Sequence, residues 1–247
     1  MSTPLDQHQV EIERNRLAWE QKPLLRELYN GFYRRILYLV DGGLPGRVVE
    51  IGSGIGNLKS HLPEAVSTDL FPNPWLDLVC DGYELPFRDG TVSHLVLFDV
   101  FHHLEAPAAF LTEAKRVLVP GGRVIIFDPC ISAASYPVYG LLHHEPVAMG
   151  KPISTATELK RPRAYYAAQG NATRVFFRGE AGKTMEGWNV FHREAFSSFA
   201  YLLSGGYSKP AVYPAGLRGN VEAIDRFLSR WPRAFAGRCL VGLTPVR

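Results

Sequence analysis

The fold is decided by residues 48–57, which read VVEIGSGIGN. Residues 48–51 have the composition of a buried strand, and three glycines follow at alternate positions in residues 52–56. Glycine is used where the backbone must turn at dihedral angles closed to other residues, and where a ligand approaches main-chain N–H groups without a Cβ in the way. The stretch therefore predicts a buried strand that ends in a ligand-binding turn.

The spacing of the glycines narrows the class of ligand. Glycine-rich turns after a strand serve nicotinamide, flavin and S-adenosylmethionine proteins alike. The dinucleotide fingerprint has the form GxGxxG, in which the third glycine allows close packing of helix on strand. Here the form is GxGxG, so the third glycine lies one position early. This spacing disfavours a nicotinamide-dependent oxidoreductase, which stays as an alternative function.

A second predicted strand, residues 65–70, ends in an acid, Asp69. Asp69 follows Glu50 by about 20 positions, and an acid at that distance can accept hydrogen bonds from the hydroxyl groups of a ribose. The alternative is a surface aspartate that begins a turn before Pro72. We therefore expect Asp69 to bind a ribose.

Three further segments continue the pattern. The loop 81–87 reads DGYELPF, in which Asp81 can accept a hydrogen bond from the exocyclic amine of an adenine, although Asp-Gly is also a favourable turn. Residues 92–98 and 118–128 read as buried strands, the second of them after the turn Pro-Gly-Gly. The order strand, helix, strand is expected throughout.

These motifs, in this order, resemble the core of the class I S-adenosylmethionine-dependent methyltransferases of the small-molecule type, over residues from about 45 to 130. They read VVEIGSGIGN, STDL, DGYELPF, LVLFDVFHHL and LVPGGRVIIF. The resemblance implies S-adenosylmethionine as the cofactor. It implies a Rossmann-like α/β fold with seven strands, mostly parallel, flanked by helices, with the last strand antiparallel and an insertion after the fifth strand.

The resemblance also assigns the cofactor site. It implies contacts from Glu50, Gly52, Ser53, Gly54, Gly56, Asp69, Leu70, Asp81, Gly82 and Phe98. The departure from the family lies at the start of the fourth strand, where a Phe-Asp pair is frequent and Ser93-His94 stands here. That difference affects the edge of the strand more than the cofactor site.

The domain organisation follows from the same reading. We expect N-terminal helices and a possible lid in residues 1–45, the cofactor-binding core in 46–130, an insertion that covers the substrate in 131–191, and the remainder of the fold in 192–247. Pro23 is expected to divide the first segment into two helices. The last segment is predicted to contain a helix over 193–203, a strand over 207–213, a helix over 221–231 and a strand over 237–246.

Composition agrees with an enzyme of this kind. No run approaches 18 apolar residues and the first residues lack a secretion signal, so a cytoplasmic protein with no membrane span is expected. The three cysteines have no metal or redox spacing. Over residues 151–219 there are ten Lys and Arg against four Glu, although the whole chain has a net charge of only +3.

This local basic charge favours a phosphate- or carboxylate-bearing acceptor, with a solvated basic face as the alternative. We expect Arg161, Arg163 or Arg174 to bind the acidic group, and Asp99 and Tyr165 to line the acceptor site. Nucleic acid is not expected as a substrate, because no recognised binding module is present. The acceptor is therefore predicted to be a small metabolite, sugar or lipid precursor, and the oligomeric state is left open.

An oxygen or nitrogen acceptor loses a proton near the methyl-transfer step, so a base is expected near the cofactor. The candidates are His103, His102 and His143. No catalytic cysteine is expected. A metal site is not expected either, because adjacent residues such as His143, His144 and Glu145 rarely point at one ion. A non-catalytic S-adenosylmethionine-binding protein is the other alternative, although its glycine loop or ribose acid would be damaged.

Overall fold

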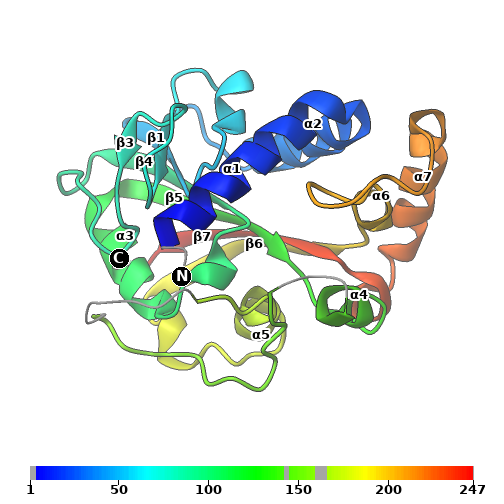
Figure 1. Cartoon of the computed structure of the whole chain (residues 1–247). Coiled ribbons are helices and arrows are strands. Elements are labelled where there is room, and N and C mark those ends of the chain that lie inside the picture. Colours follow the sequence, from blue (N-terminus) through cyan, green and yellow to red (C-terminus); the bar gives the residue numbers. More distant parts are fainter. Residues whose placement is uncertain (1–3, 142–144, 159–165, 247) are drawn as a thin grey trace.

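The computed structural model describes residues 4–141, 145–158 and 166–246 (Figure 1). The described residues form a seven-stranded sheet of order β3-β2-β1-β4-β5-β7-β6. The strands are β1 (Arg47–Ile51), β2 (Val66–Asp69), β3 (Leu78–Val79), β4 (Val92–Phe98), β5 (Leu118–Pro129), β6 (Trp188–Phe196) and β7 (Arg238–Pro245). Strand β7 is antiparallel to both of its neighbours, and the other pairings are parallel. The predicted mostly parallel sheet with an antiparallel last strand is confirmed.

Helices surround the sheet. They are α1 (Pro4–Gln21), α2 (Pro23–Tyr38), α3 (Pro107–Val117), α4 (Ser135–Leu141), α5 (Asn171–Phe177), α6 (Phe199–Leu203), α7 (Arg218–Leu228) and α8 (Pro232–Phe235). Short 3₁₀ helices are η1 (Asn57–Ser60), η2 (Phe101–His103), η3 (Gly182–Met185) and η4 (Ala215–Leu217). The predicted pair of N-terminal helices is confirmed, and Pro23 separates them because proline has no N–H to continue α1 and is favoured at a helix start.

The sheet has a hydrophobic core on each face, because alternate residues of a strand point to opposite sides. Leu95 and Leu97 of β4 join the core that α3 and α5 cover. Val96 and Phe98 join the other core, which is rich in aromatic rings from α2. Figure 1 shows α2 on one side of the sheet and α5 on the other. Strand β4, at the centre of the sheet, is therefore packed on both faces.

Two elements near the C-terminal end differ from the prediction. Residues 193–203 do not form one helix, because residues 188–196 are the edge strand β6 and only 199–203 are helical. The edge strand carries exposed and half-exposed charged side chains, as edge strands do to avoid pairing with other chains, and these obscure its period. His192, expected at a helix start, therefore lies in β6.

Residues 207–213 are not a strand but a series of turns. Pro210 cannot donate a strand hydrogen bond, and the Lys209 N–H donates to the Gly205 carbonyl at 2.9 Å. The Val212 N–H donates to the Leu203 carbonyl at 2.9 Å. The sixth strand of the sheet is instead β6, which pairs with β7.

The helix expected after the glycine turn is also shorter than predicted. Between β1 and β2 the structure has the single 3₁₀ turn η1. The chain has few residues between Gly56 and Val66, and Pro63 falls among them, so a full helix cannot be completed there. The turn nevertheless returns the chain to pair β2 with β1 in parallel.

The unusual Ser93-His94 pair has a structural explanation. The His94 ring is buried in β4, and its Nε2 accepts a hydrogen bond from the Asp41 N–H at 3.0 Å. Burial, with the charge of Arg123, lowers the pKa of His94 to about 4, so the ring stays neutral and can accept. This pair therefore anchors the segment that leads into β1.

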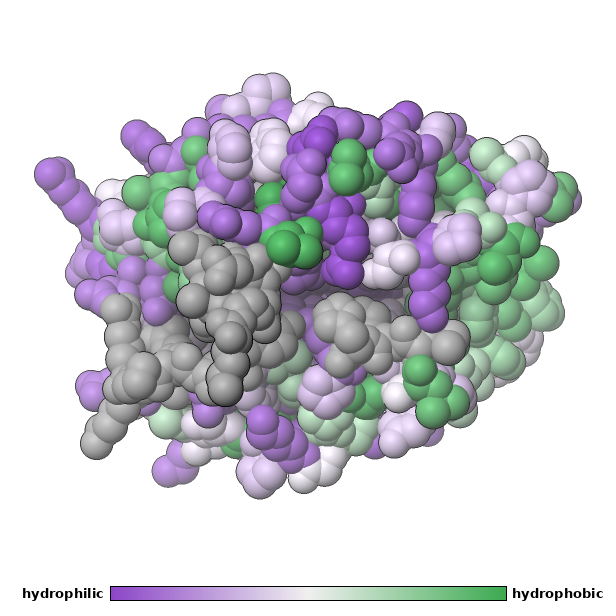
Figure 2. All heavy atoms as spheres, in the orientation of Figure 1, coloured by the Kyte–Doolittle hydropathy of each residue, from purple (hydrophilic) through white to green (hydrophobic). Residues whose placement is uncertain are grey.

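The surface also has apolar character at one end. Figure 2 shows apolar side chains gathered on the side of the molecule where Figure 1 places α7. About half of each side chain of Ile224, Phe227 and Trp231 is exposed there. No helix of the described chain has both the length and the apolar character that crossing a membrane requires. The four predicted segments and the lid role of residues 1–45 stay predictions.

Candidate active site

The glycine turn after β1 has the backbone that its sequence predicts. Gly52, Gly54 and Gly56 have φ values of +66°, +54° and +71°, the left-handed region that L side chains rarely adopt. A Cβ on Gly52 would lie 2.5 Å from Cγ2 of Val100, which follows β4. A Cβ on Gly54 would lie 3.9 Å from Ile12 of α1. The turn is thus closely packed between the end of β4 and the N-terminal helix.

Hydrogen bonds from β2 hold this turn in place. The Ser53 N–H donates to the Thr68 carbonyl at 2.8 Å, and the Thr68 N–H donates to Ser53 Oγ at 2.9 Å. The Thr68 hydroxyl and the Ser53 hydroxyl both donate to the Glu50 carbonyl. Because these bonds are buried, the position of the main-chain amides in the turn is fixed before any ligand arrives.

Asp69 lies at the end of β2 and contacts the same turn. Its Oδ2 accepts a hydrogen bond from the Gly54 N–H at 3.0 Å, and its Oδ1 accepts one from the Leu70 N–H at 2.7 Å. Each carboxylate oxygen retains a second acceptor position. The structure therefore brings Asp69 and the glycine turn together, and binding of a ribose by Asp69 stays a prediction.

Glu50, the last but one residue of β1, has an unusual environment. It is 2% exposed, and among the described residues its Oε2 has no hydrogen-bond partner. The pKa of Glu50 is raised to about 8, chiefly by burial and further by the negative charge of Asp69. A hydrogen bond with Ser53 opposes this rise but does not cancel it. A buried acceptor without a partner beside a glycine turn is what the cationic amino group of a cofactor requires.

We expect Glu50→Gln to remove part of the pH dependence of folding. A carboxyl group with a raised pKa keeps its proton in the folded state after the unfolded chain has lost it, so stability falls as the pH rises from about 4.5 to about 8. Urea unfolding of the protein without cofactor at several pH values measures this loss. In Glu50→Gln the fall over this window is expected to be smaller.

Glu64→Gln provides the control, because Glu64 is exposed. Its pH profile should follow that of the parent. Parallel profiles for the parent and Glu50→Gln would contradict the assigned environment of Glu50.

The loop after β3 supplies the other predicted cofactor contacts. Asp81 Oδ1 accepts a hydrogen bond from the Tyr83 N–H at 3.0 Å, which is a side-chain-stabilised turn. A Cβ on Gly82 would lie 3.5 Å from Phe110 and 3.6 Å from Ile51, so this loop rests directly on the core beside β1. The structure thus places Asp81 and Gly82 near the carboxyl end of β1, and their contact with an adenine stays a prediction.

The end of β4 carries Phe98 and Asp99. Asp99 has a φ of +58°, which is uncommon for a residue other than glycine. Its carboxylate pairs with Arg238 of β7, which is buried. Phe98 stacks on Tyr29 of α2, with the ring centroids 5.1 Å apart. Asp99 therefore has a structural partner that the sequence did not indicate, and its role toward an acceptor stays a prediction.

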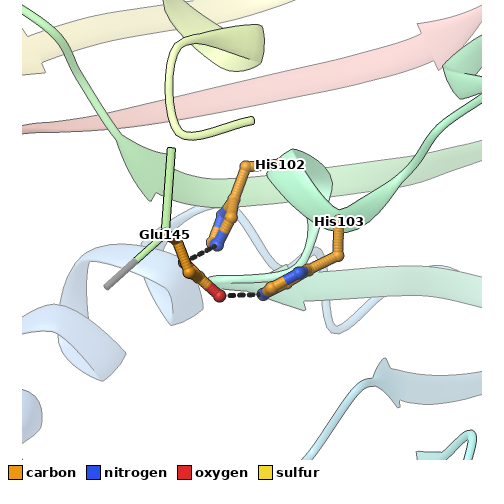
Figure 3. Close-up of side chains that lie close together, drawn as sticks. All are labelled: His102, His103 and Glu145. Atoms are coloured by element: carbon orange, nitrogen blue, oxygen red, sulfur yellow. Dashed lines mark ion pairs between the residues drawn. The ribbon is translucent and has the colours of Figure 1, made fainter. Parts of the chain in front are cut away.

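The histidines after β4 meet an acid from a distant segment (Figure 3). His102 Nε2 lies 3.3 Å from Glu145 Oε2, and His103 Nε2 lies 3.5 Å from Glu145 Oε1. On the other side of its ring, His102 Nδ1 lies 3.0 Å from Oδ1 of Asp128, at the end of β5. His103 Nδ1 lies 3.0 Å from the Tyr166 carbonyl oxygen. We call His102, His103 and Glu145 the histidine–glutamate cluster.

Burial and charge give the two rings opposite properties. Burial alone would lower the pKa of His102, but Asp128 and Glu145 outweigh it and raise the pKa to about 10. Burial, with the neighbouring charge of His102, lowers the pKa of His103 to about 4. The His102 side chain is 4% exposed and that of His103 is 33% exposed. Of the two rings, that of His103 is the one that solvent reaches.

Other predicted substrate residues are less informative. Arg161, Arg163, Tyr165 and His143 lie outside the described residues. Arg174 is buried in α5, where its Nε donates to Glu180 at 2.7 Å and its Nη1 donates to the carbonyls of Ala148 and Lys151. These contacts give Arg174 a structural role, and its contact with an acidic acceptor stays a prediction.

Asp128, Glu145 and Gln169 complete the site but were not among the predicted site residues. Asp128 ends a predicted parallel strand, and ligands of such sheets bind beyond the carboxyl ends of the strands, so its position was a usable signal. Glu145 stood in the sequence beside two histidines, but its partners in the fold are a different pair. No local pattern in the sequence indicates Gln169, which donates from Nε2 to Glu145.

Comparison with known proteins agrees with this geometry. Residues 49–126 match the family model described as a methyltransferase domain. Probable tRNA methyltransferase 9B of Mus musculus is 27% identical over 140 residues, which cover 50% of this chain and 31% of that protein. This chain therefore spans about a third of the length of that curated relative.

Solved structures share the fold at low identity. A chain of the complex between the Haloferax volcanii Trm112 methyltransferase activator and a methyltransferase is 18% identical, with a TM-score of 0.58, over 99% of this chain and 98% of that chain. Geranyl diphosphate C-methyltransferase from Streptomyces coelicolor A3(2), in complex with Mg²⁺, geranyl diphosphate and S-adenosyl-L-homocysteine, is 15% identical, with a TM-score of 0.52, over 88% of this chain and 77% of that chain. At these identities the likeness concerns the fold alone.

The strand order, the glycine turn and the acids that follow it define a Rossmann-like methyltransferase fold. With the family match over residues 49–126, the core of this chain is that of a class I S-adenosylmethionine-dependent methyltransferase. The cofactor of this class is S-adenosylmethionine, whereas the acceptor differs between members because the fold hosts many substrates.

Proposed function

We propose that this protein transfers the methyl group of S-adenosylmethionine to an oxygen or nitrogen atom of a small acceptor. The observation that carries the proposal is the unpartnered Oε2 of buried Glu50, directly before a turn with three left-handed glycines. A dinucleotide site offers its helix N-terminus to a pyrophosphate. Here a buried acid directly precedes the turn, and a carboxylate suits a cationic amino group rather than a pyrophosphate.

The residues of the site have separate tasks in this proposal. Glu50 and the amides of residues 52–56 would hold the amino acid part of the cofactor, Asp69 the ribose, and the loop of Asp81 the adenine. The bound cofactor supplies an activated methyl group on a sulfonium. The protein then has to align the acceptor with the methyl carbon and exclude water. Ile12 of α1, in contact distance of the Gly54 position, supports the predicted lid over the turn.

The acceptor is proposed to be a small molecule with an acidic group. The excess of basic residues in residues 151–219 supports this acidic group. Arg161 and Arg163 are the arginines proposed to bind it, because Nε and Nη1 of Arg174 already donate to other protein groups. The mouse relative is named for tRNA and the Streptomyces relative for geranyl diphosphate. A test should therefore include tRNA and an isoprenoid diphosphate as acceptors, together with other phosphate and carboxylate metabolites.

Calorimetry with S-adenosylhomocysteine and with NAD, side by side, tests the cofactor. We expect saturable binding of S-adenosylhomocysteine and none of NAD. A methyl-transfer screen with labelled S-adenosylmethionine then tests the reaction against acidic metabolites, isoprenoid diphosphates and bulk tRNA. Binding of NAD alone would overturn the proposal, and cofactor binding without transfer to any acceptor would favour the non-catalytic alternative.

The proton of the acceptor is proposed to leave through His103. We expect His103→Gln to lower turnover of the acceptor found in the screen by about 100-fold, the lower part of the range for general acid–base catalysis. His192→Gln is the matched control, because His192 lies in the edge strand β6 and faces Glu194. Turnover of His103→Gln within a few-fold of the parent would place the base elsewhere.

A further inference from the structure

The histidine–glutamate cluster has the arrangement of a metal site. His103 Nδ1 faces the Tyr166 carbonyl oxygen at 3.0 Å, and a carbonyl can only accept, so this nitrogen carries the hydrogen. His102 Nδ1 faces the Asp128 carboxylate at 3.0 Å in the same way. Histidines that bind metals almost always donate their other ring N–H to a carboxylate or a backbone carbonyl. Both rings therefore have the outer contacts that fix a metal-binding tautomer.

With a single hydrogen, on Nδ1, each ring would direct its Nε2 lone pair at the carboxylate of Glu145. Without an ion, the second proton of His102 lies between its Nε2 and that carboxylate. The two N···O distances are 3.3 Å and 3.5 Å. A lone pair that faces a carboxylate is repelled unless a proton or another cation lies between them. Two ligand atoms on a tetrahedral zinc ion, each about 2.1 Å from it, lie about 3.4 Å apart. The observed spacing is thus that of ligands around one ion.

Local charge also favours a cation. Glu145 and Asp128 are 7% and 0% exposed, so two carboxylates face the rings without solvent to stabilise them. Arg238 is the nearby buried cation, but its guanidinium pairs with Asp99. Buried charges are costly unless they are paired or coordinate a metal. A divalent ion between the two rings and Glu145 would be attracted by both carboxylates.

The backbone around the cluster is held by the segment that carries Tyr166 and Gln169. The Ala168 N–H donates to the His102 carbonyl at 2.9 Å, and the Gln169 N–H donates to the Pro146 carbonyl at 3.1 Å. The Gln169 side chain donates to Glu145 and is itself buried. The three ligand side chains therefore come from two segments that are tied to one frame (Figure 3).

We propose that His102 Nε2, His103 Nε2 and the Glu145 carboxylate bind one divalent transition-metal ion, with zinc the best fit. The ligand atoms all lie within 4.8 Å of one another. Two histidines and a glutamate leave a fourth coordination position open, as in catalytic zinc sites. His103 is the more exposed ligand, so the open position is expected on its side. This revises the expectation from the sequence that no metal is bound. With the ion on Nε2 and the hydrogen on Nδ1, His103 could not also accept the proton of the acceptor.

The test uses the full chain after dialysis against a chelator. Calorimetry with ZnCl₂ is expected to give one binding site per chain. Co²⁺ is expected to give the visible absorption of a low-coordinate site, a readout that needs neither cofactor nor acceptor. The proposal can therefore fail while the methyltransferase proposal stands, and the reverse also holds.

Variants locate the ion. Glu145→Gln and His103→Gln, which keep the shape of the side chain, are expected to lower zinc affinity at least 100-fold, and Asp128→Asn, behind the ligand, 10- to 100-fold. His61→Gln and His192→Gln are controls with full affinity, because His61 pairs with Asn30 and His192 lies in β6. Thermal melting of each variant without metal excludes loss through unfolding.

Three results would overturn the proposal. They are the absence of saturable heat and cobalt absorption in the parent, full zinc affinity in both Glu145→Gln and His103→Gln, and loss of affinity only in a double His143→Gln, His144→Gln variant. The first would leave a proton as the cation in the cluster. The last would place the ion on residues outside the cluster.

Discussion

Gly52→Val is expected to lower the affinity for S-adenosylhomocysteine about 1000-fold. Gly52 has a φ of +66°, and its added Cβ would lie 2.5 Å from Cγ2 of Val100. A β-branched residue in the left-handed region is strained, and overpacking costs about 1–3 kcal/mol more. If the turn relaxes from this conformation, its amides leave the ligand, and hydrogen bonds to a charged group are worth about 1.5–3 kcal/mol each. Calorimetry measures the loss.

Gly90→Val separates backbone strain from the site itself. Gly90 has a φ of +64°, nearly that of Gly52, but its added Cβ would meet no atom within 4 Å. Both variants are expected to lose stability through the left-handed backbone, about 1–2 kcal/mol, and only Gly52→Val to lose the ligand. Gly52→Ala serves if the valine variant does not fold. Equal affinities in the Gly52 and Gly90 variants would remove the glycine turn from the cofactor site.

The geometry of the glycine turn and the position of Asp69 could be predicted because they depend on local backbone conformation. The glycines must occupy left-handed conformations immediately after a strand, and Asp69 must end the next strand, so short motifs carry both requirements. Strands β1, β4 and β5 were also visible as mainly apolar runs, and β2 as a short segment that ends in an acid. Parallel strands that are covered on both faces have that composition because neither face meets water.

The histidine–glutamate cluster could not be predicted, because it depends on contacts between segments far apart in the chain. Glu145 reaches His102 and His103 only after the segment beyond β5 has folded back. Likewise Arg238 and Asp99 are 139 positions apart in the chain, and nothing local to either indicates the pair. Residues 193–196 of the edge strand β6 were predicted as part of a helix for a related reason, since their pairing with β7 is not visible in the local sequence.

Asp99→Asn is expected to destabilise the fold by about 3–5 kcal/mol. The Arg238 side chain is 3% exposed, and its guanidinium lies over the ring of Tyr201, 4.6 Å from the centroid. Among the described residues its Nε has no hydrogen-bond partner, so Asp99 is the group that balances its charge. Removing one partner of a buried pair leaves an uncompensated charge, which costs that amount. Asparagine also tolerates the left-handed backbone of residue 99, so strain does not confuse the result.

Arg238→Met and the double variant distinguish a buried charge from a lost contact. Asp99 is 29% exposed, so water can stabilise its carboxylate once the arginine is gone, and Arg238→Met is expected to cost less than Asp99→Asn. The double variant should then be more stable than Asp99→Asn alone, because the unpaired cation is no longer present.

Asp89→Asn is the control, since Asp89 is 79% exposed in its pair with Arg116 and such pairs contribute about 0–1 kcal/mol. If urea unfolding shows equal losses for Asp99→Asn and Asp89→Asn, the Arg238 charge does not depend on Asp99. The difference in the free energy of unfolding between Asp99→Asn and Arg238→Met therefore measures the cost of leaving a buried charge unpaired. That cost is separate from the loss of the ion pair, which both variants share.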